Sequence, residues 1–153
     1  MVKEIVDILK SKKVTITFAE SCTGGRVASA FTAISGVSKV FNGSVVSYSN
    51  EIKSDWLGVK EKTLIEYGAV SRECVDEMLD GVLKLAKADY AIAVSGIAGP
   101  SGGTENKPVG TVFIGVAYAK KQKIIKKFLF KGDRESIQTQ SVNSAILLLK
   151  DIL

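Results

Sequence analysis

Apolar residues recur along the chain with two different spacings, and the change from one spacing to the other divides the chain into helices and strands. Apolar positions three and four residues apart predict amphipathic helices over 2–12, 71–88 and the stretch that begins at 132. Short runs rich in β-branched residues predict strands over 14–19, 43–49, 89–95, 110–119 and 124–130. Shorter helices are predicted over 27–34, 51–57 and 60–66.

The order of these elements indicates the architecture. Helices separate the early strands, which favours a parallel core with helices on both faces, whereas the last two strands follow each other directly and predict an antiparallel hairpin. We therefore expect one domain over residues 1–153, folded as an α/β protein: a three-layer α/β/α sandwich on a mixed, mainly parallel sheet. Ligands of such folds bind outside the carboxyl ends of the strands. The turn at Ser21, residues 48–53 and residues 96–104 are expected there.

Cap residues and apolar stripes make these predictions more specific. Asn50 and Ser71 are the expected N-caps of two helices, and Gly58 and Gly68 are expected to end two others. The predicted inward stripe of the helix over 71–88 consists of Val75, Met78, Leu79, Val82, Leu83 and Leu85. The predicted inward stripe of the last helix consists of Ile137, Val142, Ala145, Ile146 and Leu149.

The turn after the first strand carries the first candidate for chemistry. Its sequence is Phe18-Ala19-Glu20-Ser21-Cys22-Thr23-Gly24-Gly25-Arg26. The first N–H groups of a helix have no internal partner and lie at the positive end of the helix dipole, so they hold anions. Ser21 is therefore a candidate nucleophile, with the amides of Thr23, Gly24 and Gly25 as candidate oxyanion donors. The alternative is that Ser21 or Thr23 only caps the helix.

The composition restricts the catalytic groups that are available. The chain has no histidine, which excludes Ser-His-Asp and Cys-His arrangements within one chain. The cysteines, Cys22 and Cys74, are too few for a disulfide scaffold and match no zinc spacing, so we expect no metal. Cys22 competes with Ser21 as nucleophile because the helix dipole favours a thiolate, although free cysteines are more commonly small buried hydrophobes.

The charge pattern gives little support for a nucleic-acid partner. The net charge is +5, and basic residues cluster at Lys120-Lys121-Gln122-Lys123 and Lys126-Lys127 without interleaved aromatics. Such a cluster is more typical of a solvated hairpin than of a nucleic-acid groove. The longest apolar runs fall short of the roughly 18 residues that a membrane span needs. We expect a soluble, cytoplasmic protein that contacts neither nucleic acid nor membrane.

Lys53 is the expected general base. If Asn50 caps its helix, Lys53 lies in the first turn, where a positive charge is unfavourable and the pKa of the amine falls. A helix end supplies at most about 2 kcal/mol toward that fall, so burial must supply the rest. The alternative is an ordinary solvated lysine. Tyr48 lies close by in the sequence as a candidate proton relay or stacking partner.

The glycine-rich segment over 96–104 is a candidate phosphate loop. Successive glycines allow backbone N–H groups to converge on a phosphate. The segment has neither the Walker nor the Rossmann fingerprint, and a plain flexible connection is the alternative. Arg134 is a candidate for a bidentate contact to phosphate or carboxylate, with a surface ion pair as the alternative.

Several motifs in the same order resemble those of the CinA C-terminal domain family. They are Ala19-Glu20-Ser21-Cys22-Thr23-Gly24-Gly25, Tyr48-Ser49-Asn50-Glu51-x-Lys53, Gly68-Ala69-Val70-Ser71, Ser95-Gly96-Ile97-Ala98-Gly99-Pro100-x-Gly102-Gly103, Lys107-Pro108-Val109-Gly110-Thr111-Val112 and Gly132-Asp133-Arg134. The resemblance covers almost the whole chain and shows no departure at the motif positions. We expect no counterpart here of the separate N-terminal domain of the long CinA proteins.

This resemblance implies hydrolysis of the carboxamide of nicotinamide mononucleotide to nicotinate mononucleotide and ammonia, with no cofactor. It implies Ser21 as nucleophile, Lys53 as base, and a homo-oligomer. We expect the substrate-binding residues to be Asn50, Ser95, Gly96, Ala98, Gly99, Gly102, Gly103, Thr111 and Arg134. The alternative is a nucleotide-binding or protein-interaction module with little turnover.

Overall fold

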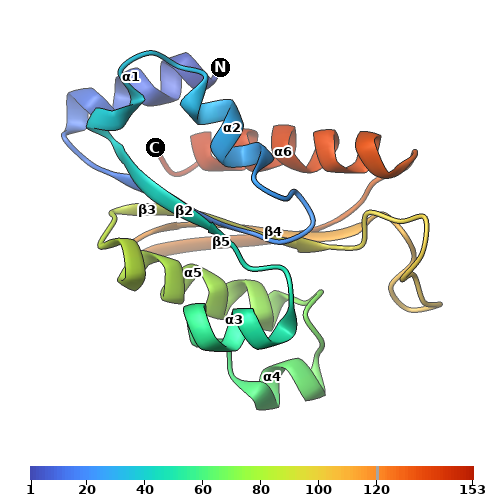
Figure 1. Ribbon diagram of the computed structural model, residues 1–153. Coiled ribbons are helices and arrows are strands. Elements are labelled where there is room, and N and C mark those ends of the chain that lie inside the picture. The colour runs from blue at the N-terminus through green and yellow to red at the C-terminus, as the bar shows by residue number, and fades with distance from the viewer. Residues whose placement is uncertain (120) are drawn as a thin grey trace.

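A five-stranded sheet forms the middle layer of the computed structural model, which describes residues 1–119 and 121–153 (Figure 1). The strands are β1 (Ile16–Glu20), β2 (Phe41–Val46), β3 (Tyr90–Gly96), β4 (Thr111–Tyr118) and β5 (Gln122–Leu129). Their spatial order is β2-β1-β3-β4-β5, with β1 parallel to β2 and β3, and with antiparallel pairing from β3 to β4 and from β4 to β5. The predicted mixed α/β/α sandwich is confirmed.

Helices cover both faces of this sheet (Figure 1). One face carries α1 (Val2–Lys12), α2 (Arg26–Thr32) and α6 (Arg134–Lys150). The other carries α3 (Asn50–Leu57), α4 (Glu61–Glu66) and α5 (Arg72–Ala86). A short 3₁₀ helix, η1 (Val37–Lys39), leads into β2. Because the central strands are covered on both sides, β1 and β3 are buried along almost their whole length.

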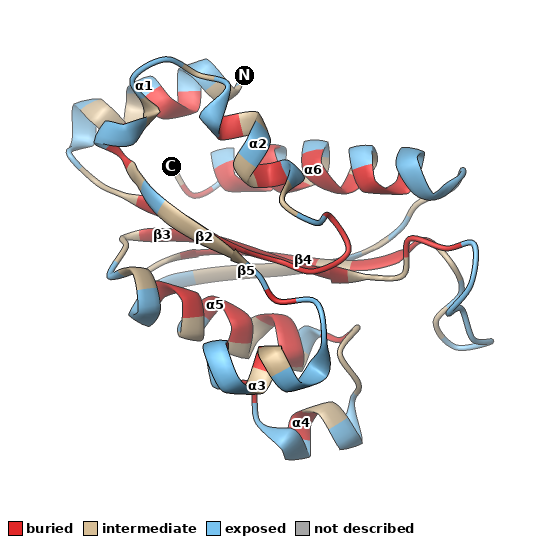
Figure 2. Cartoon of the chain, in the orientation of Figure 1, coloured by how far each residue is buried: buried red, intermediate tan, exposed pale blue. Residues whose placement is uncertain are grey.

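The core consists of two apolar layers, one on each face of the sheet, and Figure 2 shows buried residues along the central strands and on the sheet-facing sides of α5 and α6. The layer under α2 contains large side chains such as Phe18 and Phe31, whose ring centroids are 4.8 Å apart. The layer under α5 is built on small residues of the sheet. At Gly115, a Cβ would lie 2.7 Å from a methyl group of Val75, so α5 packs closely on the sheet only because a glycine stands there.

The same close packing fixes α3 against α5. A Cβ at Gly81 of α5 would overlap the carbonyl oxygen of Leu57, the last residue of α3. Gly58 ends α3 in the left-handed conformation with φ 69°, as predicted. The packing at Gly81 therefore holds α3 in one position over the sheet.

The boundaries of three predicted features differ from the structure. The strand predicted over 43–49 is Phe41–Val46, so Ser47 and Tyr48 lie beyond its end. The N-cap of α3 is Ser49 rather than Asn50, because the Ser49 side chain accepts a hydrogen bond from the Ile52 amide. Leu85, predicted to face inward, is 55% exposed because it lies in the last turn of α5, beyond the part of the helix that the sheet covers.

Other features agree with prediction. Ser71 caps α5 and accepts a hydrogen bond from the Cys74 amide. The β4–β5 hairpin pairs Thr111 with Leu129 at one end and Tyr118 with Gln122 at the other. At its turn, Lys123 forms ion pairs with Asp76 and Asp80, at 2.9 and 2.8 Å. Lys120 of the predicted lysine cluster lies outside the described residues.

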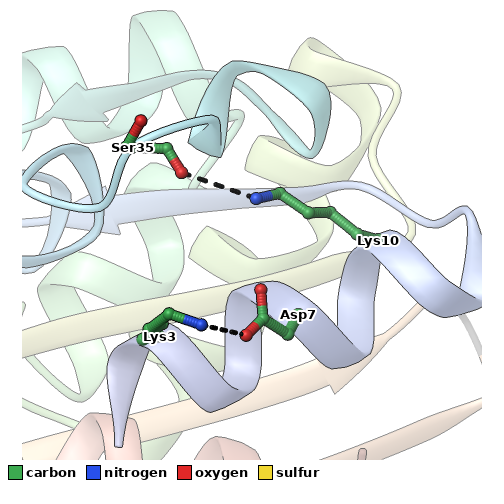
Figure 3. A network of polar contacts seen from close by, with 4 residues as sticks. All are labelled: Lys3, Asp7, Lys10 and Ser35. Atoms are coloured by element: carbon green, nitrogen blue, oxygen red, sulfur yellow. Dashed lines mark hydrogen bonds and ion pairs between the residues drawn. The ribbon is translucent and has the colours of Figure 1, made fainter.

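Polar contacts on the outer face of α1 are of the kind that a solvated helix makes (Figure 3). Lys3 and Asp7 form an i,i+4 ion pair at 2.7 Å, and Lys10 donates a hydrogen bond of 3.5 Å to the Ser35 carbonyl beyond α2. Such exposed pairs contribute little to stability. None of the helices within residues 1–119 and 121–153 has both the length and the apolar character that a bilayer crossing requires.

Candidate active site

Ser21 and Lys53 meet at the carboxyl end of β1. Ser21 follows the last residue of β1, and Lys53 reaches it from α3, 32 residues further along the chain. The Lys53 Nζ lies 3.0 Å from the Ser21 Oγ and donates a second hydrogen bond, of 2.8 Å, to the Tyr48 carbonyl. A nucleophile and a base within hydrogen-bond distance are the arrangement that serine activation requires.

The start of α3 sets the position of Lys53. With Ser49 as the cap, Lys53 is the fourth residue of the helix, and its amide donates to the Ser49 carbonyl at 3.0 Å. The first-turn location expected from the sequence is thus retained although the cap is one residue earlier. Asn50 is exposed on the outside of this turn.

The Lys53 side chain is almost completely buried, with 1% of its surface exposed. Burial lowers the pKa of Lys53, and it outweighs the thiols of Cys74 and Cys22, whose electrostatic effect would raise that pKa. Among the described residues no carboxylate forms an ion pair with Lys53. An amine in this position is driven toward the neutral form, which is the form that accepts a proton.

The turn that presents Ser21 depends on two glycines. Gly24 and Gly25 have φ values of 57° and 94°, in the left-handed region that residues with a Cβ rarely adopt. This conformation allows the chain to turn from β1 into α2 within a few residues. Gly25 is the N-cap residue of α2, which has no side-chain cap, so neither Ser21 nor Thr23 serves as a cap.

The amides at the start of α2 are not free, contrary to the expectation from the sequence. The carboxylate of Glu20 is fully buried and accepts hydrogen bonds from the Val27 amide at 2.9 Å and the Ala28 amide at 3.0 Å. It also accepts one from the Thr23 hydroxyl at 2.7 Å. Glu20 thus occupies the positive end of the short helix and fixes the Ser21 turn against it. The signal for this role is a charged residue at the end of an otherwise apolar, buried strand.

Only part of the predicted oxyanion group remains available. The Gly24 amide donates to the Ser21 carbonyl at 3.0 Å, which removes it from the set. Within the described residues, the amides of Thr23 and Gly25 have no acceptor. These two are the remaining candidate donors for an oxyanion at Ser21.

Arg134 connects two of the three stretches that were predicted to meet at this edge, residues 48–53 and residues 96–104. It is the first residue of α6, and the Asp133 side chain caps that helix. Its guanidinium donates to the Gly99 carbonyl at 2.7 Å and to the Tyr48 hydroxyl at 2.9 Å. The alternative of a surface ion pair finds no partner among the described residues.

Tyr48 has a different geometry from that expected of a proton relay. Its side chain is 57% exposed and its hydroxyl is directed to Arg134, whereas its backbone carbonyl contacts Lys53. The hydroxyl makes no hydrogen bond to Ser21 or Lys53 in the described part of the chain. The main chain of Tyr48, rather than its phenol, contacts Lys53.

Several residues of the predicted substrate-binding set make internal contacts. Ser95 and Thr111 are buried, and their hydroxyls donate to the carbonyls of Ala69 at 2.8 Å and Pro108 at 2.6 Å. Ala98 is buried in the core and Gly96 is paired within the sheet. These four positions were predicted to bind substrate, but their side chains or backbones hold the loop in place.

The exposed members of the predicted set are Asn50, Gly102, Gly103 and Arg134. Gly99 is buried, and its carbonyl accepts the hydrogen bond from Arg134.

Burial disfavours the thiolate form of both cysteines. Burial raises the pKa of Cys22 to about 12 and that of Cys74 to about 11. Cys22 is thus a small buried hydrophobe, the alternative given for it above. No local sequence pattern marks Gln138, a buried residue of α6 whose amide donates to the Cys22 carbonyl at 2.9 Å and so helps to hold the turn.

The fold and this geometry define a class: a three-layer α/β domain with a buried serine–lysine pair at the carboxyl edge of its parallel strands. The sequence profile of the CinA C-terminal domain matches residues 1–153. The chain belongs to the CinA C-terminal domain family.

Curated relatives and solved structures agree with this assignment. A CinA-like protein of Endomicrobium trichonymphae is 56% identical over 94% of the chain, but the match covers 33% of that protein. The chain spans about a third of the length of this and similar relatives. The nicotinamide-nucleotide amidohydrolase PncC of Escherichia coli is 47% identical over 96% of the chain and is itself 89% covered. The crystal structure of the competence/damage inducible protein CihA from Agrobacterium tumefaciens superposes with a TM-score of 0.96 at 36% identity, covering 98% of this chain and 92% of that one.

Proposed function

We propose that the protein is an amidohydrolase that converts nicotinamide mononucleotide and water to nicotinate mononucleotide and ammonia. The observation that carries the proposal is the 3.0 Å distance between the Ser21 Oγ and the Nζ of a buried lysine. The similarity to the E. coli amidohydrolase PncC, which covers most of both chains, supports this choice of substrate.

The first half of the proposed reaction forms an acyl-enzyme. Neutral Lys53 accepts the proton of Ser21, and the Oγ attacks the carboxamide carbon. The amides of Thr23 and Gly25 stabilise the negative charge that develops on the carboxamide oxygen. The C–N bond then breaks, and the protonated Lys53 gives its proton to the departing nitrogen, which leaves as ammonia.

The second half releases the acid and restores the resting site. A water molecule gives a proton to Lys53 and attacks the acyl carbon. The bond from that carbon to the Ser21 Oγ breaks, and Lys53 returns the proton to the Oγ. The sum of both halves is one amide and one water consumed, with one acid and one ammonia formed.

Recognition of the nucleotide falls to the exposed edge of the site. Arg134 carries a guanidinium held between the Gly99 carbonyl and the Tyr48 hydroxyl, an orientation in which it can pair with a phosphate. Gly102 and Gly103 are exposed in the adjoining loop, and their backbone amides are the proposed donors to phosphate oxygens. The exposed ring of Tyr48 is the proposed stacking surface for the pyridine.

An ammonia-release assay tests this function. Purified protein is incubated with nicotinamide mononucleotide, and ammonia is measured for the parent protein, Ser21→Ala and Lys53→Ala. Ser29→Ala and Lys39→Ala are matched controls, since both residues are exposed on other elements. We expect release by the parent and the controls and loss of release, by a factor of at least about a hundred, in the two site variants. Tight binding of the nucleotide without release by the parent would instead identify a binding module.

A further inference from the structure

Three serines lie side by side at the carboxyl end of the parallel strands. Glu20 pairs with Val46 on one side and with Val94 on the other, so the next residues in register are Ser21, Ser47 and Ser95. Two backbone hydrogen bonds extend this register by one residue: the Ser47 amide donates to the Glu20 carbonyl at 2.8 Å, and the Ser21 amide donates to the Val94 carbonyl at 3.0 Å. Neighbouring strands lie about 4.8 Å apart, so Ser21 has a serine on each side at this spacing.

All three serines belong to the face of the sheet that α3 and α5 cover. Alternate residues of a strand share a face, which places Ser21 with Ala19, Ser47 with Val45, and Ser95 with Ala93. Ala19 and Ala93 are core residues of the layer beneath α5, and Val45 packs against that layer. Lys53 enters the site from this same side, on α3.

Two of the three serines, Ser21 and Ser95, have side-chain hydrogen-bond partners, whereas Ser47 has none among the described residues. Ser21 contacts Lys53, and Ser95 donates to the Ala69 carbonyl. Ser47 is fully buried, yet its hydroxyl oxygen has no hydrogen-bond partner among the described residues. Leaving a buried hydroxyl unpaired is costly, so a native protein that keeps one calls for a reason.

Ser47 is also a neighbour, in the chain or in the sheet register, of both groups that bind the amine of the proposed base. The Lys53 Nζ is bonded to the carbonyl of Tyr48, the residue that follows Ser47, and to the hydroxyl of Ser21, the residue in register with it. These two contacts place the amine between Ser21 and the end of β2. The protonated amine has three N–H groups, so these two contacts leave one of them without an acceptor.

We propose that the Ser47 hydroxyl accepts this remaining N–H when Lys53 is protonated, and that Ser47 is therefore a positioning residue for the base. The inference rests on the proposed function, because Lys53 becomes protonated in the step that forms the acyl-enzyme. An unpaired N–H on an ammonium is far more costly than one on a neutral amine, so the contact stabilises the protonated state selectively.

The other groups that face the amine do not compete for this role. Cys74 from α5 and Cys22 from the turn after β1 have raised pKa values and are neutral thiols, which are weak acceptors. The carboxylate of Glu20 is committed to the start of α2. Arg134 acts electrostatically on Cys22, and Glu77 and Lys107 act on Cys74; none of the three forms a hydrogen bond with Lys53 within the described residues.

A titration of Lys53 by NMR tests the proposal without substrate. The Cε and Nζ signals of isotopically labelled lysine are followed against pH, and the Lys53 signal is assigned by its absence in Lys53→Met. We expect Ser47→Ala to lower the pKa of Lys53 below that of the parent, and Ser47→Thr, which keeps the hydroxyl, to restore it. Ser44→Ala, on the same strand but the opposite face, is the control and leaves the pKa unchanged. Equal Lys53 pKa values in the parent and Ser47→Ala would overturn the proposal.

Stability and kinetics separate this role from a structural one. Since Ser47→Ala removes an unpartnered hydroxyl, its Tm should equal or exceed that of the parent, while kcat falls about tenfold at constant KM. The acid limb of the kcat profile moves to lower pH. A lower Tm with unchanged kcat would overturn the role. If the parent protein releases no ammonia, the proposed function fails, and the titration alone decides whether Ser47 supports Lys53.

Discussion

Replacing Lys53 with methionine measures how far the folded protein disfavours the charge on this amine. Methionine keeps an unbranched apolar chain of similar length but has no ionisable group. In the parent, Lys53 is buried with 1% exposure, and burial lowers the pKa of its amine from the ordinary 10.5. The variant removes that effect and leaves the other titrating groups of the chain unchanged.

The expected effect has a definite sign. Between the folded pKa of Lys53 and 10.5, the unfolded chain binds more protons than the folded protein, so stability rises with pH. Every pH unit in that interval adds about 1.4 kcal/mol to the free energy of unfolding. For a chain of this size that corresponds to about 3–5 °C in Tm. Below the folded pKa the full destabilisation is present, and above 10.5 it is absent.

The assay is thermal unfolding of both proteins across pH 6 to 11. We expect the Tm of the parent minus the Tm of Lys53→Met to increase as pH rises through this interval. Lys39→Met, at an exposed lysine of η1, is the control and should give a difference that does not vary with pH. A constant difference for Lys53→Met as well would mean that the amine titrates in the folded protein as it does in the unfolded chain. The assignment of Lys53 as general base would then be wrong.

Three further variants test other parts of the site. Glu20→Gln places an NH₂ group against one of the α2 amides and removes the charge at the helix start. Urea denaturation should therefore show that the free energy of unfolding falls by about 2–4 kcal/mol, and an unchanged value would contradict the role given to this carboxylate. Because the pKa of Cys22 is raised to about 12, iodoacetamide at pH 8 should leave activity intact, and inactivation traced to Cys22 by peptide mapping would contradict its burial. Tyr48→Phe keeps the carbonyl that contacts Lys53 but loses the hydroxyl that contacts Arg134, so KM should rise several-fold while kcat stays nearly unchanged. A decrease in kcat of about a hundredfold would instead assign the phenol hydroxyl to the chemistry.

Much of the fold was predictable because its signals are local. The two apolar periods identified every long helix and strand, and Ser71 and Gly58 marked their boundaries correctly. Errors occurred where a neighbouring element decides the outcome. Leu85 satisfies the helical period but lies beyond the region of α5 that the sheet covers. The end of β2 depends on its pairing with β1, which the sequence of β2 alone does not contain.

The site was predictable as a set of residue types more than as a geometry. The absence of histidine restricts the base of a serine nucleophile, and the first turn of a helix singled out Lys53 among many lysines. Burial of Ser95 and Thr111 was missed because serine and threonine next to glycines occur equally in ligand loops and in internal turns. The sequence pattern predicted no role for Glu20 or Ser47. Glu20 matters because its carboxylate binds amides of α2, and Ser47 because its buried hydroxyl has no partner among the described residues; both facts depend on the tertiary structure.

The sequence by itself determined the secondary structure, the α/β class and the kinds of groups that carry the chemistry, because these follow from side-chain periodicity and residue chemistry within short stretches. Only the tertiary structure decided which of those groups meet. Placing β1 between β2 and β3 brings Ser21 within 3.0 Å of an amine 32 residues away and lines up three serines from separate strands. Burial of Lys53 depends in the same way on α5 lying close enough to hold α3 over the sheet. Strand order and helix packing are decided by contacts between distant segments, and those contacts also bury Lys53 and lower the pKa of its amine.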